Sequence, residues 1–247
     1  MRLTVIGSGD AFGSGGRFNT CFHVATAERK ILIDCGASSL VALRAHGVDP
    51  NAVDGIVLSH LHGDHFGGIP FVMLEAQHLS RRERPLTIAG PPGTRERITA
   101  ILEAMFPGSS KSKWRFAWSM VEIEIAKPTD ILGFTVTSAE VIHNSGAPST
   151  ALRVSDGAKV LAYSGDTQWT DALLPIASGV DLFIVECFDY ARDLTGHLNW
   201  TTVKQRLADF AARRVMITHM NPTMLARLDE ARSSGVLVAE DGLVIDV

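Results

Sequence analysis

The chain has 247 residues, of which 46% are hydrophobic and 20% are charged, and its formal net charge is −4. This composition is typical of a globular protein and excludes a disordered or fibrous chain. The mildly acidic balance excludes a chain-wide basic surface for nucleic acid. No run of about 18 apolar residues occurs, so no membrane-spanning segment is expected. One domain over residues 1–247 is the expected organisation.

Strands and helices are predicted to alternate in the first half of the chain. The expected strands cover residues 3–6, 21–25, 30–34, 55–59 and 86–89, and the expected helices cover residues 38–46, 69–79 and 94–106. A glycine-rich loop at 7–16 separates the first two strands, and the charged run at 81–85 is expected to be a solvated turn.

The second half repeats this alternation. Strands are expected at residues 134–142, 151–154, 159–163, 182–185, 215–218 and 243–247. Helices are expected at 201–212 and after Pro222. No short-period repeat or low-complexity segment occurs.

The three cysteines of the chain are scattered and have no C-x-x-C spacing. Cys21, Cys35 and Cys187 therefore indicate a reducing compartment and buried, inert thiols. Residues 1–7 lack the long apolar region and cleavage site of a signal peptide. These features predict a cytoplasmic protein.

Polar side chains with metal-binding potential follow several of the predicted strands. They are His60, His143, Asp166, Glu186 and His219. In layered α/β folds, ligands collect beyond the carboxyl ends of the strands, where loops carry polar groups without disrupting the core. These residues are therefore expected to meet at one edge. The remaining histidines outside this pattern, His23, His46 and His78, are expected to be structural.

The densest of these sites is the segment His60-Leu61-His62-Gly63-Asp64-His65. Imidazole suits zinc and other transition metals, and carboxylate oxygen suits most of them. A Zn–N bond is only about 2.0–2.1 Å long, so the ligands must converge tightly. Gly63 lets the chain bend between the ligands. The segment therefore predicts a metal site.

The chain resembles the metallo-β-lactamase superfamily in an ordered set of motifs. They are this cluster, then His143, then Ser164-Gly165-Asp166-Thr167, and finally His219. The resemblance covers nearly the whole chain and implies an α/β fold, a four-layer αββα sandwich with a dinuclear metal site. It also implies which residues hold the two ions. One ion would be held by His60, His62 and His143, and the other by Asp64, His65 and His219. Asp166 would bridge both.

Within the superfamily, the chain is most similar to the ribonuclease Z group and related phosphodiesterases. Residues 7–11 and 17–20 resemble the glycine loop of that group, and Glu186 with Gly196-His197-Leu198 resembles its catalytic Glu/His pair. The long arm by which ribonuclease Z grips transfer RNA is missing. Only the segment from Lys111 to Trp118 interleaves cations with aromatic rings as nucleic-acid-binding segments do. A solvated loop returning to a core strand is the favoured interpretation of this segment, so RNA is not the favoured substrate.

These features predict a hydrolase with two divalent ions, zinc being the expected metal and manganese or iron the alternatives. A hydroxide shared by the ions would attack the substrate. Asp64 would both ligate a metal ion and orient this hydroxide. His197, polarised by Glu186, would protonate the leaving oxygen or hold a phosphoryl oxygen. A phosphodiesterase acting on a nucleotide, a small cyclic phosphodiester or RNA is the leading hypothesis.

Two alternatives remain open at this stage. One is a hydrolase of carboxylic esters, lactones or β-lactams that uses the same ions. The other is a non-catalytic binding protein of the same fold, which the full set of ligands disfavours. The family resemblance also suggests a homodimer.

Overall fold

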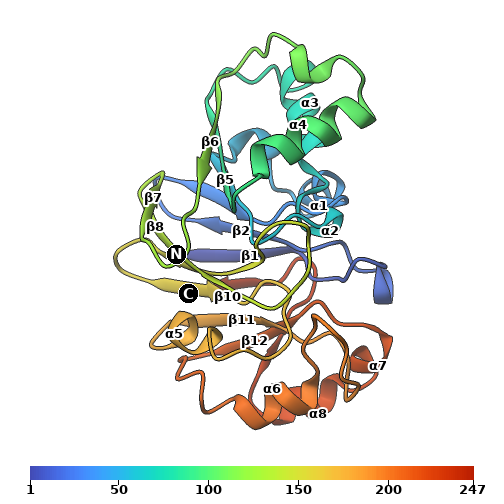
Figure 1. Cartoon of the computed structure of the whole chain (residues 1–247), viewed down its shortest axis with the longest axis vertical. Helices are drawn as coiled ribbons and strands as arrows, with labels where there is room; N and C mark the ends of the chain where they lie inside the picture. Colours follow the sequence, from blue (N-terminus) through green and yellow to red (C-terminus); the bar gives the residue numbers. More distant parts are fainter.

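Two seven-stranded sheets face each other in the computed structural model, which describes all residues, 1–247 (Figure 1). In order across the first sheet, the strands are β14 (Val244–Asp246), β1 (Arg2–Gly7), β2 (Cys21–Ala25), β3 (Lys30–Ile33), β4 (Gly55–Val57), β5 (Leu86–Gly90) and β6 (Trp118–Glu122). Across the second they are β13 (Leu237–Val238), β12 (Val215–Thr218), β11 (Leu182–Glu186), β10 (Val160–Tyr163), β9 (Thr150–Ser155), β8 (Phe134–Glu140) and β7 (Thr129–Ile131).

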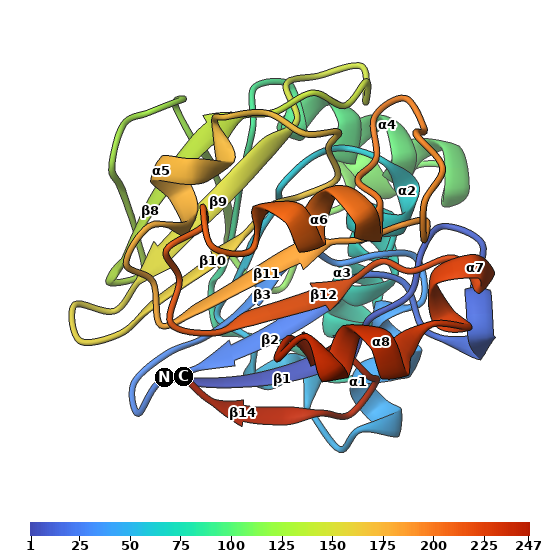
Figure 2. The same cartoon turned by 90° about the horizontal axis from the view of Figure 1, so that it is seen from below.

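Helices cover the outer face of each sheet, so that the molecule has four layers (Figures 1 and 2). The helices of the first half are α1 (Ser39–Ala45), α2 (Gly63–Phe66), α3 (Ile69–His78) and α4 (Thr94–Met105). Those of the second half are α5 (Leu173–Ala177), α6 (Trp200–Arg206), α7 (Pro222–Leu225) and α8 (Leu228–Ser233). None of these helices has the length and apolar character needed to cross a lipid bilayer.

Three buried apolar clusters fill the three spaces between the layers. The middle cluster joins the two sheets and contains Phe22 and Tyr163, whose rings meet edge to face at 5.3 Å. The two outer clusters pack helices against one sheet each, with Ile69 in the first and Val203 in the second. This packing confirms the predicted αββα sandwich.

The pairing of the strands places the loops that carry the polar residues. Strands β3 to β6 pair in parallel in the first sheet, and β10 to β13 pair in parallel in the second. The carboxyl ends of neighbouring parallel strands lie at the same edge of a sheet. The outer strand β14 pairs antiparallel with β1, which brings the two termini together (Figure 2).

One predicted helix is much shorter than expected. The helix predicted over 201–212 ends as α6 at Arg206, and the chain then turns. Phe210, which the helical pattern placed on the same helix, instead packs edge to face on Phe183 at 4.8 Å. Burial of this ring against the second sheet outweighs the local preference for continuing the helix. The helix predicted after Pro222 is divided into α7 and α8.

The charged run at 81–85 is only partly the solvated turn that was predicted. Arg82 is 2% exposed, and its guanidinium donates hydrogen bonds to the carbonyls of Val53 (2.8 Å) and Pro85 (2.6 Å). Carbonyl oxygens thus satisfy the buried guanidinium, and the hydrogen bond to Val53 holds this turn against the segment that precedes β4. The prediction of a solvated side chain is therefore wrong for Arg82. In the sequence, nothing distinguishes Arg82 from the other charged residues of this run.

The segment from Lys111 to Trp118 turns its aromatic rings toward the protein. Phe116 is buried, Trp114 packs beside it with the ring centroids 5.7 Å apart, and Trp118 begins β6. This arrangement is the predicted loop that returns to a strand. It leaves these rings engaged with the core of the first sheet.

Candidate metal centre

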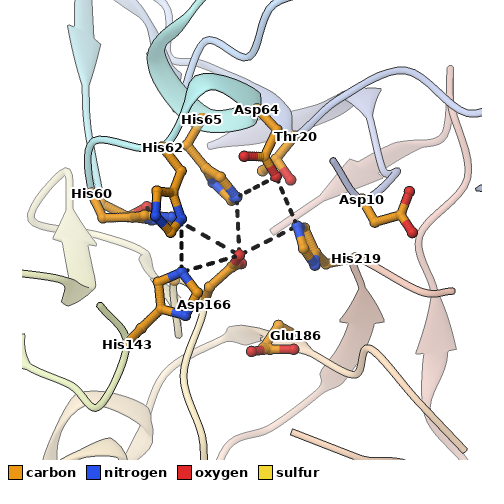
Figure 3. Close-up of polar contacts among 12 residues, drawn as sticks. Asp10, Thr20, His60, His62, Asp64, His65, His143, Asp166, Glu186 and His219 are labelled. Atoms are coloured by element: carbon orange, nitrogen blue, oxygen red, sulfur yellow. Dashed lines mark hydrogen bonds and ion pairs between the residues drawn. The ribbon is translucent and has the colours of Figure 1, made fainter. Parts of the chain in front are cut away.

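Seven side chains converge where the carboxyl ends of the two sheets meet (Figure 3). The loop after β4 and the single turn of α2 supply four of them, and the loops after β8, β10 and β12 supply one each. They are His60, His62, Asp64, His65, His143, Asp166 and His219. All seven were predicted from the sequence, and the structure brings all of them together.

The position of α2 depends on a close approach of two backbones. A Cβ atom on Gly36 would lie 2.1 Å from the carbonyl oxygen of Asp64, so only glycine fits there. The backbone N–H of Cys35 also donates to the carbonyl of His65 at 2.6 Å. The end of β3 therefore holds the turn that carries Asp64 and His65.

Asp166 lies at the centre of the cluster, as Figure 3 shows. Its Oδ2 atom is 3.3 Å from Nε2 of both His65 and His219, and 3.9 Å from Nε2 of both His60 and His143. One carboxylate thus faces imidazoles from both halves of the chain. It is 2% exposed, so water barely reaches it.

Two sets of ligand atoms can be distinguished around this carboxylate. In one, Nε2 of His143 lies 2.9 Å from Nδ1 of His62, and His60 completes the group. In the other, Oδ2 of Asp64 lies 3.3 Å from Nε2 of His65 and 3.2 Å from Nε2 of His219, and Asp166 completes it. Within each set all ligand atoms lie within 4.8 Å of one another.

Hydrogen bonds on the far side of three rings fix their orientation. Nδ1 of His65 lies 2.7 Å from Oδ2 of Asp34, and Nδ1 of His143 lies 2.8 Å from the carbonyl oxygen of Gly196. Nδ1 of His60 lies 3.0 Å from the hydroxyl of Ser59. Each of these bonds leaves Nε2 directed into the cluster, which is the arrangement that metal-ligating histidines require.

The side chains present fit a metal ion. Nε2 of His60, Nε2 of His65 and Oδ1 of Asp166 are buried and have no hydrogen-bond partner. Burying such atoms unpaired is costly, and a cation would satisfy them. Burial also holds the pKa of His60 well below its ordinary value, so its ring stays neutral as a ligand must. Mixed imidazole and carboxylate donors suit zinc, iron and manganese.

Beside the seven residues, His197 forms a pair with Glu186 at the end of β11. Nδ1 of His197 lies 3.1 Å from Oε1 of Glu186, and the backbone N–H of Thr167 donates to the same oxygen at 2.7 Å. Burial disfavours the imidazolium, but the hydrogen bond and charge of Glu186 outweigh it and raise the pKa of His197 to about 9. The pair was predicted from the sequence, and a protonated imidazole here is a potential acid.

A cavity of about 350 Å³ opens over the cluster. Its polar wall includes His62, Asp64 and His197, and its apolar wall consists of Ala11, Phe12 and Phe188. The ring of Phe188 stacks on His197 at a centroid distance of 4.7 Å and an interplanar angle of 28°. A molecule bound in this cavity would therefore contact both the potential acid and five of the potential metal ligands.

Several groups around the centre were not predicted as parts of it. Asp34 directly follows a buried apolar strand, the same signal that identified His60, so the sequence could have revealed it. The Gly196 carbonyl and the rings of Phe12 and Phe188 carry no such signal. Their roles depend on the paths of loops, which local sequence does not determine.

Comparison with protein families identifies the chain. A model described as "Anti-Pycsar protein Apyc1" matches residues 1–241. The chain belongs to this family. Among curated relatives, the probable metallo-hydrolase YhfI of Bacillus subtilis (strain 168) is 27% identical, and the match covers 89% of this chain and 87% of the relative. A ribonuclease Z of Mycobacterium bovis (strain BCG / Pasteur 1173P2) is 29% identical, and the match covers 74% of this chain and 69% of the ribonuclease.

Solved structures agree on the fold. The crystal structure of the metallo-β-lactamase fold protein YhfI from B. subtilis has a TM-score of 0.80 at 23% identity, and the match covers 99% of both chains. The short form of human tRNase Z has a TM-score of 0.79 at 23% identity, covering 100% of this chain and 99% of its own. The predicted superfamily is therefore confirmed: the chain is a metal-dependent hydrolase with the metallo-β-lactamase fold.

Proposed function

We propose that the chain is a phosphodiesterase with a dinuclear metal site, acting on a nucleotide or a small cyclic phosphodiester. The observation that carries this proposal is the His197–Glu186 pair, whose His197 lines the same cavity as five of the seven potential ligands. Cleavage of a phosphodiester releases an alkoxide oxygen that needs a proton, and an acid positioned beside the ions would supply it.

The two ligand sets support a proposal of one ion in each. His60, His62 and His143 would hold one, Asp64, His65 and His219 the other, and Asp166 would contact both. Two divalent ions, with zinc expected and manganese or iron as alternatives, would polarise the phosphoryl oxygens and lower the pKa of bound water. Asp64, which contacts the cavity as well as two histidines, would also orient the attacking water.

His197 is well placed to donate the proton. Its Nδ1 is engaged by Glu186, which leaves Nε2 as the atom that can reach a leaving oxygen. Glu186 is fully buried and is fixed by the Thr167 N–H, so it holds the ring in one orientation and favours its protonated form. Glu186 therefore acts through His197 as a positioning residue.

The size of the cavity favours a small substrate over RNA. A volume of about 350 Å³ is in the lower range of small-molecule sites. The aromatic rings between Lys111 and Trp118 pack toward the protein and are not displayed for bases to stack on. A nucleotide-sized phosphodiester suits both features.

Turnover of a small panel of substrates tests the proposal. The zinc-loaded protein is assayed with bis(4-nitrophenyl) phosphate, a 2′,3′- and a 3′,5′-cyclic mononucleotide, a lactone and a cephalosporin. Hydrolysis of the phosphodiesters is the expected result. Turnover of the lactone or cephalosporin, with none of the phosphodiesters, would replace the proposal by the carboxylic ester alternative.

A further inference from the structure

Phe12 is an exposed aromatic residue at the mouth of the metal centre. Its side chain is 82% exposed, more than that of any other exposed large hydrophobic residue of the chain. Exposing a whole phenyl ring forfeits the free energy that its burial would contribute. A single exposed apolar residue needs no explanation on an ordinary surface, but Phe12 lines the cavity over the potential ligands.

The loop that carries Phe12 is held in shape from within. The buried carboxylate of Asp10 accepts hydrogen bonds from the backbone N–H groups of Phe12 (3.1 Å) and Ser14 (2.9 Å), and from the Ser14 hydroxyl (2.6 Å). In Figure 3 this carboxylate is turned away from the histidines, so it serves the loop and not the metal cluster. Asn19 donates to the carbonyl of Asp10 at 3.0 Å.

The same loop is also fastened to the metal centre. The carbonyl oxygen of Ser8 accepts the backbone N–H of His219 at 3.1 Å, and the Ser8 N–H and hydroxyl donate to Asp241 at 2.8 and 2.7 Å. The backbone of the loop that carries Phe12 is thus held relative to a metal-site histidine. A backbone that is already ordered loses little conformational freedom when a ligand binds.

The cavity has one further aromatic wall. Phe188 stacks on His197 and is tilted against His219 at 5.9 Å, so its ring is already engaged by the site. Phe12 has no aromatic or cationic partner of this kind. The free ring faces a cavity in which the phosphoryl group would lie at the ions, so a planar group attached to that phosphoryl group would reach it.

We propose that Phe12 forms a stacking subsite for the base of a nucleotide substrate. The inference rests on the proposed phosphodiesterase function and makes it more specific, because it favours phosphoesters that carry a planar base. Aromatic rings stack on every base through its π-face, so the subsite confers affinity for bases in general and no preference among them.

Binding of two probes to the zinc-loaded protein tests the subsite. Adenosine 5′-monophosphate carries a base, whereas ribose 5-phosphate carries the same phosphorylated sugar without one. Phe12→Leu keeps an apolar side chain but removes the ring, and is expected to weaken binding of the mononucleotide by about 5- to 150-fold. Binding of ribose 5-phosphate should stay within twofold. In Phe12→Trp, the mononucleotide should bind as in the wild type and quench the new indole.

A matched control and two contrary outcomes complete the test. Leu79→Ala changes another exposed apolar side chain (68% exposed), far from the cavity residues in sequence, and should affect neither probe. Equal binding of the mononucleotide by wild type and Phe12→Leu would overturn the inference. So would a change in sedimentation of Phe12→Leu, which would make Phe12 a contact between copies. Because these measurements follow binding and need no turnover, they test the stacking subsite even if the phosphodiesterase assay fails.

Discussion

Nδ1 of His65 donates a hydrogen bond of 2.7 Å to Oδ2 of Asp34, a carboxylate that lies 31 residues earlier in the chain and is fully buried. The other oxygen of Asp34 accepts the backbone N–H of Ser59, and Oδ2 also accepts the Ser59 hydroxyl, both at 2.7 Å. Asp34 itself adopts a left-handed backbone conformation, with φ of 59°. The end of β3 is therefore shaped to orient a potential metal ligand on α2.

Replacing Asp34 should weaken metal binding without removing a ligand. Asp34→Asn keeps the volume of the side chain but loses its charge, and loss of such a partner is expected to lower metal affinity by about 10- to 100-fold. Competition with a chromogenic zinc chelator measures the affinity. Asp10→Asn is the matched control, since Asp10 is equally buried but contacts no histidine. Unchanged zinc affinity in Asp34→Asn would refute the role of this hydrogen bond.

Removal of the imidazole of His197 should impair the reaction far more than metal binding. His197→Ala is expected to lower kcat for a 3′,5′-cyclic mononucleotide by about 10²- to 10⁴-fold, the usual contribution of a general acid, because the leaving ribose oxygen needs a proton. Zinc content, measured by elemental analysis, should remain that of the wild type. His78→Ala, at an exposed histidine of α3, serves as the control. Loss of zinc together with activity would instead make His197 a metal ligand.

His23 should make the stability of the protein depend on pH. Its ring on β2 is 8% exposed and its buried Nε2 has no partner, and burial, aided by the charge of Lys30, lowers its pKa from 6.5 to about 4. The unfolded chain therefore binds more protons than the folded protein between these values. Stability contributed by the neutral ring is lost as the pH falls from 6.5 toward 4, by an amount on the order of 3 kcal/mol.

Urea unfolding at a series of pH values isolates this contribution. The free energy of unfolding of His23→Gln should fall less steeply between pH 6.5 and 4 than that of the wild type. His78→Gln replaces an exposed histidine and should follow the wild type. Parallel curves for His23→Gln and the wild type would show that His23 titrates normally in the folded protein.

Metal removal should lower the stability of the folded chain. Zinc bound only to the folded state at 100-fold its Kd contributes about 2.7 kcal/mol per site. For a chain of about 250 residues, each 1 kcal/mol corresponds to about 2–4 °C in Tm. Thermal unfolding with and without a chelator should show this difference. In Asp166→Asn, which alters the carboxylate that faces histidines of both ligand sets, the difference should shrink markedly. A Tm indifferent to zinc in the wild type would argue against a metal site of this affinity.

Much of the fold and of the centre could be predicted because the responsible signals are local. The apolar strands and the polar residues that follow them are visible in the sequence, so His60, His143, Asp166 and His219 could be placed at one edge. The division of the ligands into two sets came from the family resemblance, and it stays a prediction; in the structure Asp166 groups with Asp64, His65 and His219.

The features that were missed depend on contacts between distant segments. Helix α6 ends early because Phe210 is buried on Phe183, and Arg82 is buried because it donates hydrogen bonds to carbonyls of its own turn and of the segment before β4. Tertiary packing decides each of these cases, and local propensity is too weak to predict them.

The rate of bis(4-nitrophenyl) phosphate hydrolysis, measured as zinc is added stepwise to the metal-free protein, tests the central claim most directly. If each ligand set holds one ion, as proposed, the rate should reach its maximum at two zinc ions per chain. A maximum at one ion per chain, with no gain from the second, would contradict a dinuclear phosphodiesterase, as would the absence of any hydrolysis at full zinc loading.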